Sequence, residues 1–497
     1  MSSKKELVTL TIDGKEVKAP RGENLLKILK RERAGVPYYC YHAGLSVAGA
    51  CRMCMVEVEK APRPVIACNT FVSEGMVVNT QTEKIKEIRK WNLAFHLINH
   101  PLDCPICDQA GECGLQKYYM RHGKYNSDMF EQKVLKRKVI SIGKYVMLDT
   151  ERCILCSRCV RFFDEVPKTS EMAIFNRGDR SEIGTYENKD LNNNYTLNSV
   201  DICPVGALTS KDFRFKKRVW FLKSFDSICP GCSTGCNVRI DEDPREKRAF
   251  RMLPRHNEEV NGYWMCDYGR MRYKQTHSEN RIPYPMVKTE EGLRPTDWEE
   301  AHQQLSELWK INPAEIAVLI TPQYTTEELE TIYAFFNTQL KIQNIFHCAD
   351  SKTASDPAIT DELLLRKDKN PNSEGLLSVS KAYHLDEQDF LSFKKALDAQ
   401  SWKALFVFGP EDPESYPDFL RWMDDLPAGP PPAGLLKKVL IGTQASQATE
   451  RFDLVLPTLS FVEKEGHFVN FQKRSQKISA GIKLMEQAKP ISEILCL

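Results

Sequence analysis

The chain has little net charge and no long apolar segment. Its 497 residues carry a formal net charge of +2 at pH 7, without an extended basic tract of the kind that binds nucleic acid. No apolar run approaches the roughly 20 residues that a membrane-spanning helix needs, and the mean hydropathy is −0.43. We therefore expect no nucleic-acid partner, and any association with a membrane through partner proteins only.

The sequence also shows neither a leader pattern nor a disulfide framework. Met1-Ser-Ser-Lys-Lys passes at once into an alternating run over 7–12, without the amphipathic Arg- and Ser-rich segment of a transit peptide. The 17 cysteines are odd in number, and their CxxC pairs lie too near each other to close useful loops. A chain of this length can also build several cores without disulfides. These features predict a bacterial cytoplasmic protein.

Cysteine is nevertheless the most informative residue type. Fifteen of the 17 cysteines lie in the first 266 residues and, with one histidine, form four complete groups. Thiolates hold iron–sulfur clusters, and a CxxC pair lets one tight loop present two sulfurs while backbone N–H groups face the cluster. Four such groups in succession predict an iron–sulfur protein. We name them the Cys40 set (Cys40, Cys51, Cys54 and Cys68), the His100 set (His100, Cys104, Cys107 and Cys113), the Cys153 set (Cys153, Cys156, Cys159 and Cys203) and the Cys229 set (Cys229, Cys232, Cys236 and Cys266).

The spacing within each set indicates the type of cluster. The Cys40 set has the pattern C-x10-C-x2-C-x13-C after the small residues 48–50, which favours a [2Fe–2S] centre, with a zinc site as the alternative. The Cys153 set joins a CxxCxxC triplet to a distant Cys203-Pro204, which favours one [4Fe–4S] cluster. The Cys229 set forms a C-x2-C-x3-C-x29-C tetrad, for which we also expect a [4Fe–4S] cluster.

The assignment of His100 as a ligand depends on the number of cysteines that follow it. A lone histidine at a helix end is usually a capping or core residue, but the tract from Cys104 to Cys113 has only three thiolates before the next complete set. A neutral imidazole in place of a thiolate raises the potential of a cluster. A thioredoxin-like role for Cys104-Pro-Ile-Cys107 is the rival, and no βαβ pattern surrounds it. We predict a third [4Fe–4S] cluster here.

The remaining histidines and cysteines close to these patterns are expected to be structural. His42, His96 and His122 lie near the sets but outside the motifs, and Cys348 is expected to be a buried thiol at the end of a strand.

Residues 1–270 contain the signals of several small domains. Alternation over 6–18 around Asp13-Gly14 predicts a β-hairpin, and 23–33 predicts a helix that ends before Cys40, which is the order of a β-grasp ferredoxin. Residues 82–99 are helical in pattern and should support His100 rigidly. The Asn-rich segment 178–198 predicts an exposed loop or a poorly ordered hairpin.

The region after residue 270 has a different pattern. Apolar runs of strand length at 316–320, 405–408, 439–442 and 454–456 alternate with helical stretches such as 326–340, which predicts an α/β domain with a parallel sheet. A surface linker is predicted at the Pro-rich segment 427–432. The fold class is therefore multi-domain, α+β and α/β, with expected domains at 1–80 ([2Fe–2S] ferredoxin-like), 81–145 (helical, His100 set), 146–222 (ferredoxin-like, Cys153 set), 223–270 (small cap, Cys229 set) and 271–497 (α/β).

The order of the four sets resembles the large iron–sulfur subunit of respiratory complex I, NADH:quinone oxidoreductase. The specific motifs are Cys51-Arg-Met-Cys54, the tract His100-Pro-Leu-Asp-Cys104 through Cys113, and Cys153-Ile-Leu-Cys156. Trp298-Glu-Glu-Ala301 and the segment 456–470 look like the start and end of a molybdopterin-oxidoreductase domain. That domain is shorter than in typical bacterial members, and Cys266-Asp-Tyr268-Gly-Arg270 lacks the lysine that leads electrons to a pterin in related enzymes. The resemblance therefore implies a truncated domain without molybdopterin.

The resemblance also implies a function. The Cys40 set would accept electrons from an NADH-binding flavoprotein subunit and pass them to the Cys153 set, then to the His100 set, then toward quinone, with the Cys229 set off this route and structural. The chain would have no catalytic site of its own and would lie on the cytoplasmic side of the bacterial inner membrane, held by other peripheral-arm subunits. The alternative is an electron-transfer subunit of a soluble NAD-linked hydrogenase or formate dehydrogenase. The C-terminal region as an assembly platform is compatible with the leading hypothesis.

Overall fold

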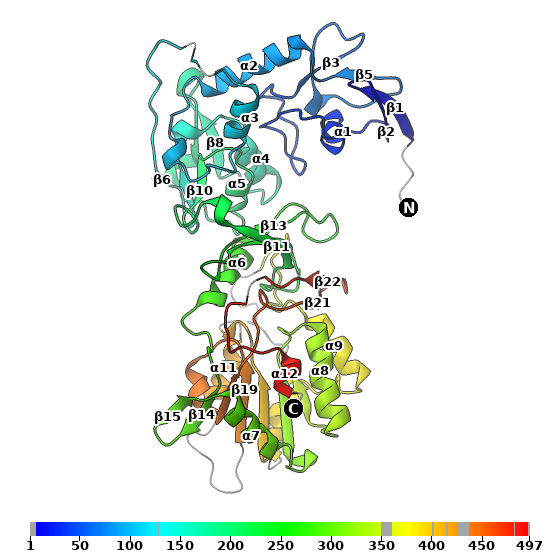
Figure 1. Cartoon of the computed structure of the whole chain (residues 1–497), viewed down its shortest axis with the longest axis vertical. Coiled ribbons are helices and arrows are strands. Elements are labelled where there is room, and N and C mark those ends of the chain that lie inside the picture. Colours follow the sequence, from blue (N-terminus) through cyan, green and yellow to red (C-terminus); the bar gives the residue numbers. More distant parts are fainter. Residues whose placement is uncertain are drawn as a thin grey trace. The chain divides into compact units, whose positions relative to one another are not determined.

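A computed structural model describes the chain at residues 6–124, 126–127, 129–348, 360–399, 402–413, 416–424, 437–481 and 483–495. The chain divides into two compact units, Met1–Phe221 and Leu222–Leu497 (Figure 1). The first contains the Cys40, His100 and Cys153 sets, and the second contains the Cys229 set. The predicted linker at 427–432 lies outside the described residues.

The N-terminal part of the first unit is a five-stranded sheet with one helix against it. The predicted hairpin is confirmed: β1 (Leu7–Ile12) pairs antiparallel with β2 (Lys15–Pro20), and Asp13 and Gly14 both have positive φ, as a primed turn requires. The predicted helix is also confirmed as α1 (Leu25–Arg31), which starts at the Asn24 N-cap and buries its apolar face in the sheet core. The strand order is β2-β1-β5-β3-β4, with β3 (Met55–Val58), β4 (Val65–Ile66) and β5 (Val77–Asn79).

As far as the structure describes it, the rest of the first unit combines four α-helices with short strands and long irregular segments. The predicted helix at 82–99 is α2 (Glu83–Leu97), which the Thr82 hydroxyl caps. Most cysteines of the His100 and Cys153 sets lie in irregular segments beside short helices and strands. These elements are α3 (Gly114–His122), β6 (Ile140–Ser141), β7 (Val146–Leu148), α4 (Arg158–Glu165), β8 (Met172–Phe175), β9 (Glu182–Thr185), α5 (Asn198–Asp201) and β10 (Leu208–Ser210).

The prediction for 178–198 was wrong in part. Its first half completes the β8–β9 hairpin, but Tyr195, Leu197 and Asn198 are buried. The apolar side chains between the asparagines pack inward, and the Asn198 amide donates to the Tyr195 carbonyl at 3.0 Å. Local polarity predicted exposure, whereas tertiary packing buries this end of the segment.

The second unit begins with a three-stranded antiparallel sheet that carries the Cys229 set. Its strands are β11 (Lys223–Ile228), β12 (Asn237–Asp243) and β13 (Arg248–Pro254), and β11 leads directly into Cys229. Cys266 is the N-cap of the short helix α6 (Asp267–Arg270). The loops at the ends of these elements therefore hold all four cysteines.

The rest of the second unit is the predicted α/β domain. Its described strands form a seven-stranded sheet in the order β15-β14-β20-β19-β18-β16-β17, and the strands from β20 to β17 run parallel. Alternate side chains enter two apolar cores, one on each face. The strands are β14 (Met286–Thr289), β15 (Gly292–Pro295), β16 (Ile316–Ile320), β17 (Ile345–His347), β18 (Ala404–Phe408), β19 (Lys437–Gly442) and β20 (Leu454–Pro457), and a separate hairpin joins β21 (Gly466–Val469) to β22 (Ser475–Ile478).

The helices of this domain follow the predicted apolar periodicity. The predicted helix at 326–340 is α8 (Thr326–Tyr333) with a π-helical continuation over Ala334–Gln339, and a Thr325–Glu328 capping box begins it. The others are α7 (Trp298–Leu308), α9 (Ser373–Ala382), α10 (Phe390–Ala399), α11 (Pro417–Asp424) and α12 (Ile491–Leu495).

Candidate metal centres

The four sulfurs of the Cys40 set lie together in the first unit. The side chain of Cys40 interacts with those of Cys51 and Cys68, and the side chain of Cys54 interacts with that of Cys68. Backbone N–H groups add to this: Tyr39 donates to the Cys51 sulfur at 3.4 Å. Interaction with the side chains of Cys51 and Cys68 holds the pKa of Cys40 well below its usual value. All four side chains are buried, so they form a closed, sulfur-lined site.

The sulfurs of the Cys153 set line one small cavity together with Val205, Ala207 and Leu208. Two residues between the triplet cysteines, Leu155 and Ser157, have φ of 52° and 57°, which is uncommon for residues other than glycine. This backbone turns N–H groups toward the sulfurs, as when Leu155 donates to Cys153 at 3.3 Å. Burial raises the pKa of every thiol in this set. The site therefore favours a positively charged group that stabilises thiolates.

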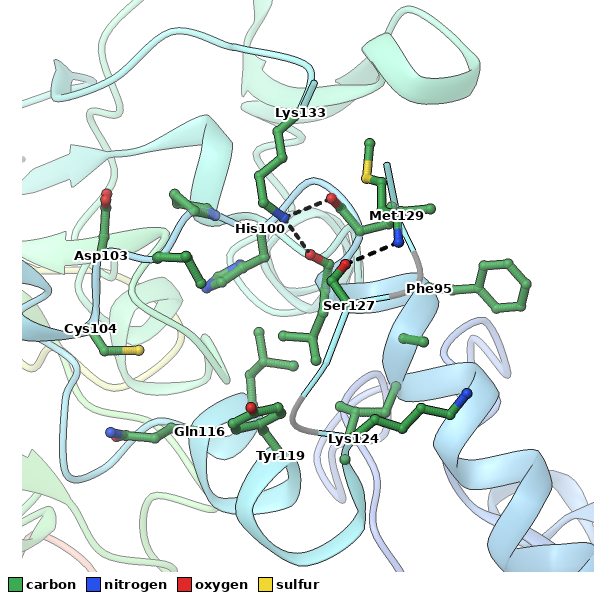
Figure 2. Close-up of a pocket in the computed structure, with 18 of the residues that line it drawn as sticks. Phe95, His100, Asp103, Cys104, Gln116, Tyr119, Lys124, Ser127, Met129 and Lys133 are labelled. Carbon is green, nitrogen blue, oxygen red and sulfur yellow. Dashed lines mark hydrogen bonds between the residues drawn. The ribbon is translucent and has the colours of Figure 1, made fainter. Parts of the chain in front are cut away.

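The four residues of the His100 set line one cavity of about 570 Å³. Figure 2 shows the His100 ring and the Cys104 sulfur pointing into it. Burial, with the positive charges of Arg152 and Lys133, lowers the pKa of His100 to about 4. The imidazole is therefore neutral at pH 7, which is the form that binds metal. Its Nδ1 is buried and has no hydrogen-bond partner among the described residues, as expected of an atom reserved for a ligand bond.

A lysine side chain and a glycine shape the cavity of the His100 set. Lys133 donates to the carbonyls of Leu97 and Ile98 at 3.1 and 2.8 Å, which fixes the loop beside His100 (Figure 2). A Cβ atom added at Gly206 would lie only 2.3 Å from the Cys107 sulfur. The absence of a side chain at Gly206 thus leaves room for the sulfur.

The cysteines of the Cys229 set are all buried in the second unit. The Gly269 N–H donates to the Cys266 sulfur at 3.3 Å, and the Cys232 thiol donates to the Leu364 carbonyl at 3.8 Å. A Cβ at Gly269 would lie 2.7 Å from the Cys229 sulfur, so this glycine also permits a close approach. Burial raises the pKa of Cys229 to about 12. The donor set and its glycine cradle fit a thiolate-bound cluster.

No three His, Cys, Asp or Glu side chains within the described ranges converge as ligands of a single metal ion do. The thiolates of an iron–sulfur cluster are distributed over two or four iron atoms and need no common point of convergence.

Two of the histidines expected to be structural, His42 and His96, have ordinary hydrogen-bond partners, whereas the buried Nε2 of His122 has none among the described residues. His42 accepts from the Gly44 N–H at 3.2 Å, and the His96 ring lies 3.1 Å from the Cys51 carbonyl oxygen. Burial lowers the pKa of both rings. Cys348 is buried in the core on one face of the parallel sheet.

The sequence reasoning missed the residues that join the sets to one another. Arg161 donates to the carbonyl of Cys40 and to that of Cys156, at 3.5 Å for the latter. The N–H of Gly114 donates to the Pro204 carbonyl at 2.8 Å, which links the neighbours of Cys113 and Cys203. These contacts join residues far apart in the chain, and no local motif signals them.

Four family models match successive parts of the chain. They are a 2Fe-2S iron-sulfur cluster binding domain at 5–83, an NADH-ubiquinone oxidoreductase-G iron-sulfur binding region at 89–128, an NADH-quinone oxidoreductase subunit 3 ferredoxin-like domain at 143–209, and a molybdopterin oxidoreductase Fe4S4 domain at 222–278. The chain therefore contains [2Fe–2S] and [4Fe–4S] binding domains in a mixed α and β fold.

Curated relatives cover the same region. The NADH-quinone oxidoreductase subunit designated G in Streptomyces coelicolor is 37% identical over 343 residues, which is 68% of this chain and 40% of the relative. The mitochondrial NADH dehydrogenase [ubiquinone] iron-sulfur protein 1 of Solanum tuberosum is 39% identical over 345 residues, 69% of this chain and 46% of the relative. A solved NAD+-reducing [NiFe]-hydrogenase covers 43% of this chain and 91% of its own at 25% identity, with a TM-score of 0.38 that is too low to establish a shared fold.

The matches span less than half the length of these curated relatives. No helix in the described ranges is both long and apolar enough to cross a membrane. The identity over some 340 residues and the order of the matched iron–sulfur models agree with each other. Over the matched region the chain is similar to the G subunit of NADH-quinone oxidoreductase and to the mitochondrial NADH dehydrogenase [ubiquinone] iron-sulfur protein 1.

Proposed function

We propose that the chain is an electron-transfer subunit of NADH:quinone oxidoreductase and relays electrons through three clusters in its first unit. The Cys40 set holds a [2Fe–2S] cluster, and the Cys153 and His100 sets each hold a [4Fe–4S] cluster. The Cys229 set holds a further [4Fe–4S] cluster off this route. The enzyme's NADH and quinone sites belong to other subunits, and this chain supplies no catalytic side chain.

One observation supports the relay: hydrogen bonds join the Cys40 set to the Cys153 set, and the Cys153 set to the His100 set. The Arg161 guanidinium bonds the backbone of a ligand residue in the Cys40 set and of one in the Cys153 set. The Gly114–Pro204 hydrogen bond then joins the Cys153 set to the His100 set. Ligands of all three sets share one buried core, namely Cys40, Cys51, Cys113 and Cys156, with Cys153 and Cys203 packed against it. Electron transfer is steeply distance-dependent, and this packing provides short steps.

The proposal includes five domains, at 1–80, 81–145, 146–222, 223–270 and 271–497, and the last has no molybdopterin. Open α/β sheets bind ligands at the carboxyl ends of their parallel strands. Here buried side chains occupy that edge: Arg281 pairs with Glu463 at 2.9 Å, and the Tyr324 hydroxyl lies 3.1 Å from the Gly409 carbonyl and 3.0 Å from that of Ile441. This packing supports a truncated molybdopterin-oxidoreductase-like domain with a structural role.

The partners of the proposed relay are an NADH-oxidising flavoprotein subunit before the Cys40 set and a peripheral-arm subunit leading to quinone after the His100 set. Attachment to the cytoplasmic side of the bacterial inner membrane comes through those subunits.

Two measurements test this function. The anaerobically reconstituted chain should hold about 14 iron and 14 sulfide and no zinc, because one [2Fe–2S] and three [4Fe–4S] clusters need those amounts. The chain isolated from the cells that make it should co-purify with a flavoprotein and catalyse NADH:quinone reduction. Co-purification with a hydrogen- or formate-oxidising enzyme would instead establish the alternative, and about 10 iron with one zinc would remove one [4Fe–4S] set.

A further inference from the structure

A distant segment of the second unit covers the Cys229 set. The Ser233 N–H donates to the Asp368 carbonyl at 2.9 Å, and the Thr234 hydroxyl donates to the Leu364 carbonyl. The Cys232 thiol donates to that same Leu364 carbonyl at 3.8 Å. The segment over 364–368 is thus fixed against the loop that presents Cys232, although more than 130 residues separate the two in the chain.

This covering segment brings a buried lysine to the site. Lys369 is only 1% exposed, and its ammonium lies 5.3 Å from the centre of the Tyr268 ring, two residues after Cys266. It also donates to the Arg366 carbonyl. Burying an ammonium group costs free energy unless groups of opposite polarity surround it. The neighbours of Lys369 therefore indicate what its charge stabilises.

Two cysteines of the Cys229 set are among those neighbours. Burial lowers the pKa of Lys369, while Cys232 and Cys266, and after them Asp361 and Asp368, act to raise it. A second cation, Arg272, lies 4.3 Å from the Tyr268 ring, but it forms an ion pair with Asp412. Arg272 is thus paired directly with a carboxylate, and the charge of Lys369 acts on the cysteines Cys232 and Cys266 as well as on Asp361 and Asp368.

We propose that Lys369 stabilises the reduced form of the cluster in the Cys229 set and so raises its reduction potential. Reduction adds one electron, hence one negative charge, to a cluster with thiolate ligands, and a buried cation interacts more strongly with the more negative state. The charge of Lys369 thus keeps the reduction potential of this cluster high enough for the cluster to be reduced. The inference rests on the proposed cluster in the Cys229 set and goes beyond its structural role.

The test is a reductive titration of the reconstituted full-length chain, followed by EPR. The signal of this cluster is identified as the one that Cys236→Ala removes. Lys369→Met should lower the ratio of reduced to oxidised cluster at least tenfold at a fixed potential, which corresponds to about 59 mV for one electron. Lys369→Arg should keep most of the wild-type potential. Lys367→Met is the matched control, since Lys367 is an exposed lysine two residues away and its loss should leave the potential unchanged.

The other possible outcomes also support or overturn the inference about Lys369. An unchanged potential in Lys369→Met with full iron content would overturn the inference and leave the relay of the first unit intact. If both Lys369→Met and Lys369→Gln lose this cluster while Lys369→Arg keeps it, the need for charge is supported. Loss of the cluster in all three variants would show a packing role and overturn the inference. A wild-type chain without this cluster would overturn both the inference and the assignment of the Cys229 set.

Discussion

Gly206→Ala tests whether Cys107 is a cluster ligand. The added Cβ would lie 2.3 Å from the Cys107 sulfur, whereas ordinary contact begins at 3.4 Å, and 3.2 Å from the Cβ of Gln109. The sulfur would have to move by about 1 Å. A free cysteine can rotate away from such a contact at little cost. A thiolate bonded to iron cannot, because the cluster and its other ligands fix its position.

The expected result follows from that difference. With Cys107 as a ligand, overpacking should cost about 1–3 kcal/mol of unfolding free energy, and the His100 set should lose its cluster. Iron would then fall from about 14 to about 10 per chain, with loss of one [4Fe–4S] EPR signal. The backbone at Gly206 does not need a positive φ, so alanine adds no backbone strain. Gly442→Ala is the control, because the atoms nearest to its added Cβ lie 4.0 Å away. Full iron content and an unchanged signal in Gly206→Ala would refute the ligand role of Cys107.

Three further predictions concern single sites. His100→Cys should keep its cluster but lower its potential in a redox titration, because a thiolate adds negative charge; unchanged potentials at every centre would exclude His100 as a ligand. Replacing Cys232 and Cys236 with alanine should reduce assembly into the complex while electron flux per assembled complex stays near normal; normal assembly with a flux about tenfold lower, near 1.4 kcal/mol of barrier, would put this cluster on the route. Burial raises the pKa of the Glu411 carboxyl from 4.5 to about 7. The folded chain therefore binds the carboxyl proton more tightly than the unfolded chain, and the free energy of unfolding falls as the pH rises from about 4.5 to 7. Glu411→Gln should flatten this fall when thermal unfolding is measured against pH, and parallel stability curves for the two proteins would contradict the assignment.

Local pattern in the sequence predicted much of the secondary structure. The Asp13-Gly14 turn needs only two adjacent residues with positive φ, and the strand at 316–320 is a continuous apolar run, as expected of a strand buried on both faces. The ligand sets were predicted for a similar reason, since cluster chemistry requires thiolates at short spacings. Features that depend on a few consecutive residues can be predicted from the sequence alone.

The links between sites depend on contacts that no local pattern contains. Arg161 and Cys40 are separated by 121 residues, and their hydrogen bond exists only because α4 packs beside the ligand loop of the Cys40 set. The same holds for Gly206, which is ordinary in sequence and becomes critical only where the chain brings it against Cys107. Cysteine spacing therefore predicts how many clusters the chain holds, while the order in which they exchange electrons depends on long-range packing.

The two units differ in what contacts their cysteine sets. In the first unit, the contacts that matter run from one ligand set to another, through Arg161 and through the Gly114–Pro204 bond. In the second unit, the ligand loop is instead covered by its own domain, at Leu364 and Asp368, and a buried lysine accompanies that cover. A relay needs short steps between clusters, whereas a cluster that stabilises a domain needs enclosure. The contacts of the Cys229 set are those of enclosure, and the charge of Lys369 would keep an enclosed cluster reducible even though it lies off the proposed relay.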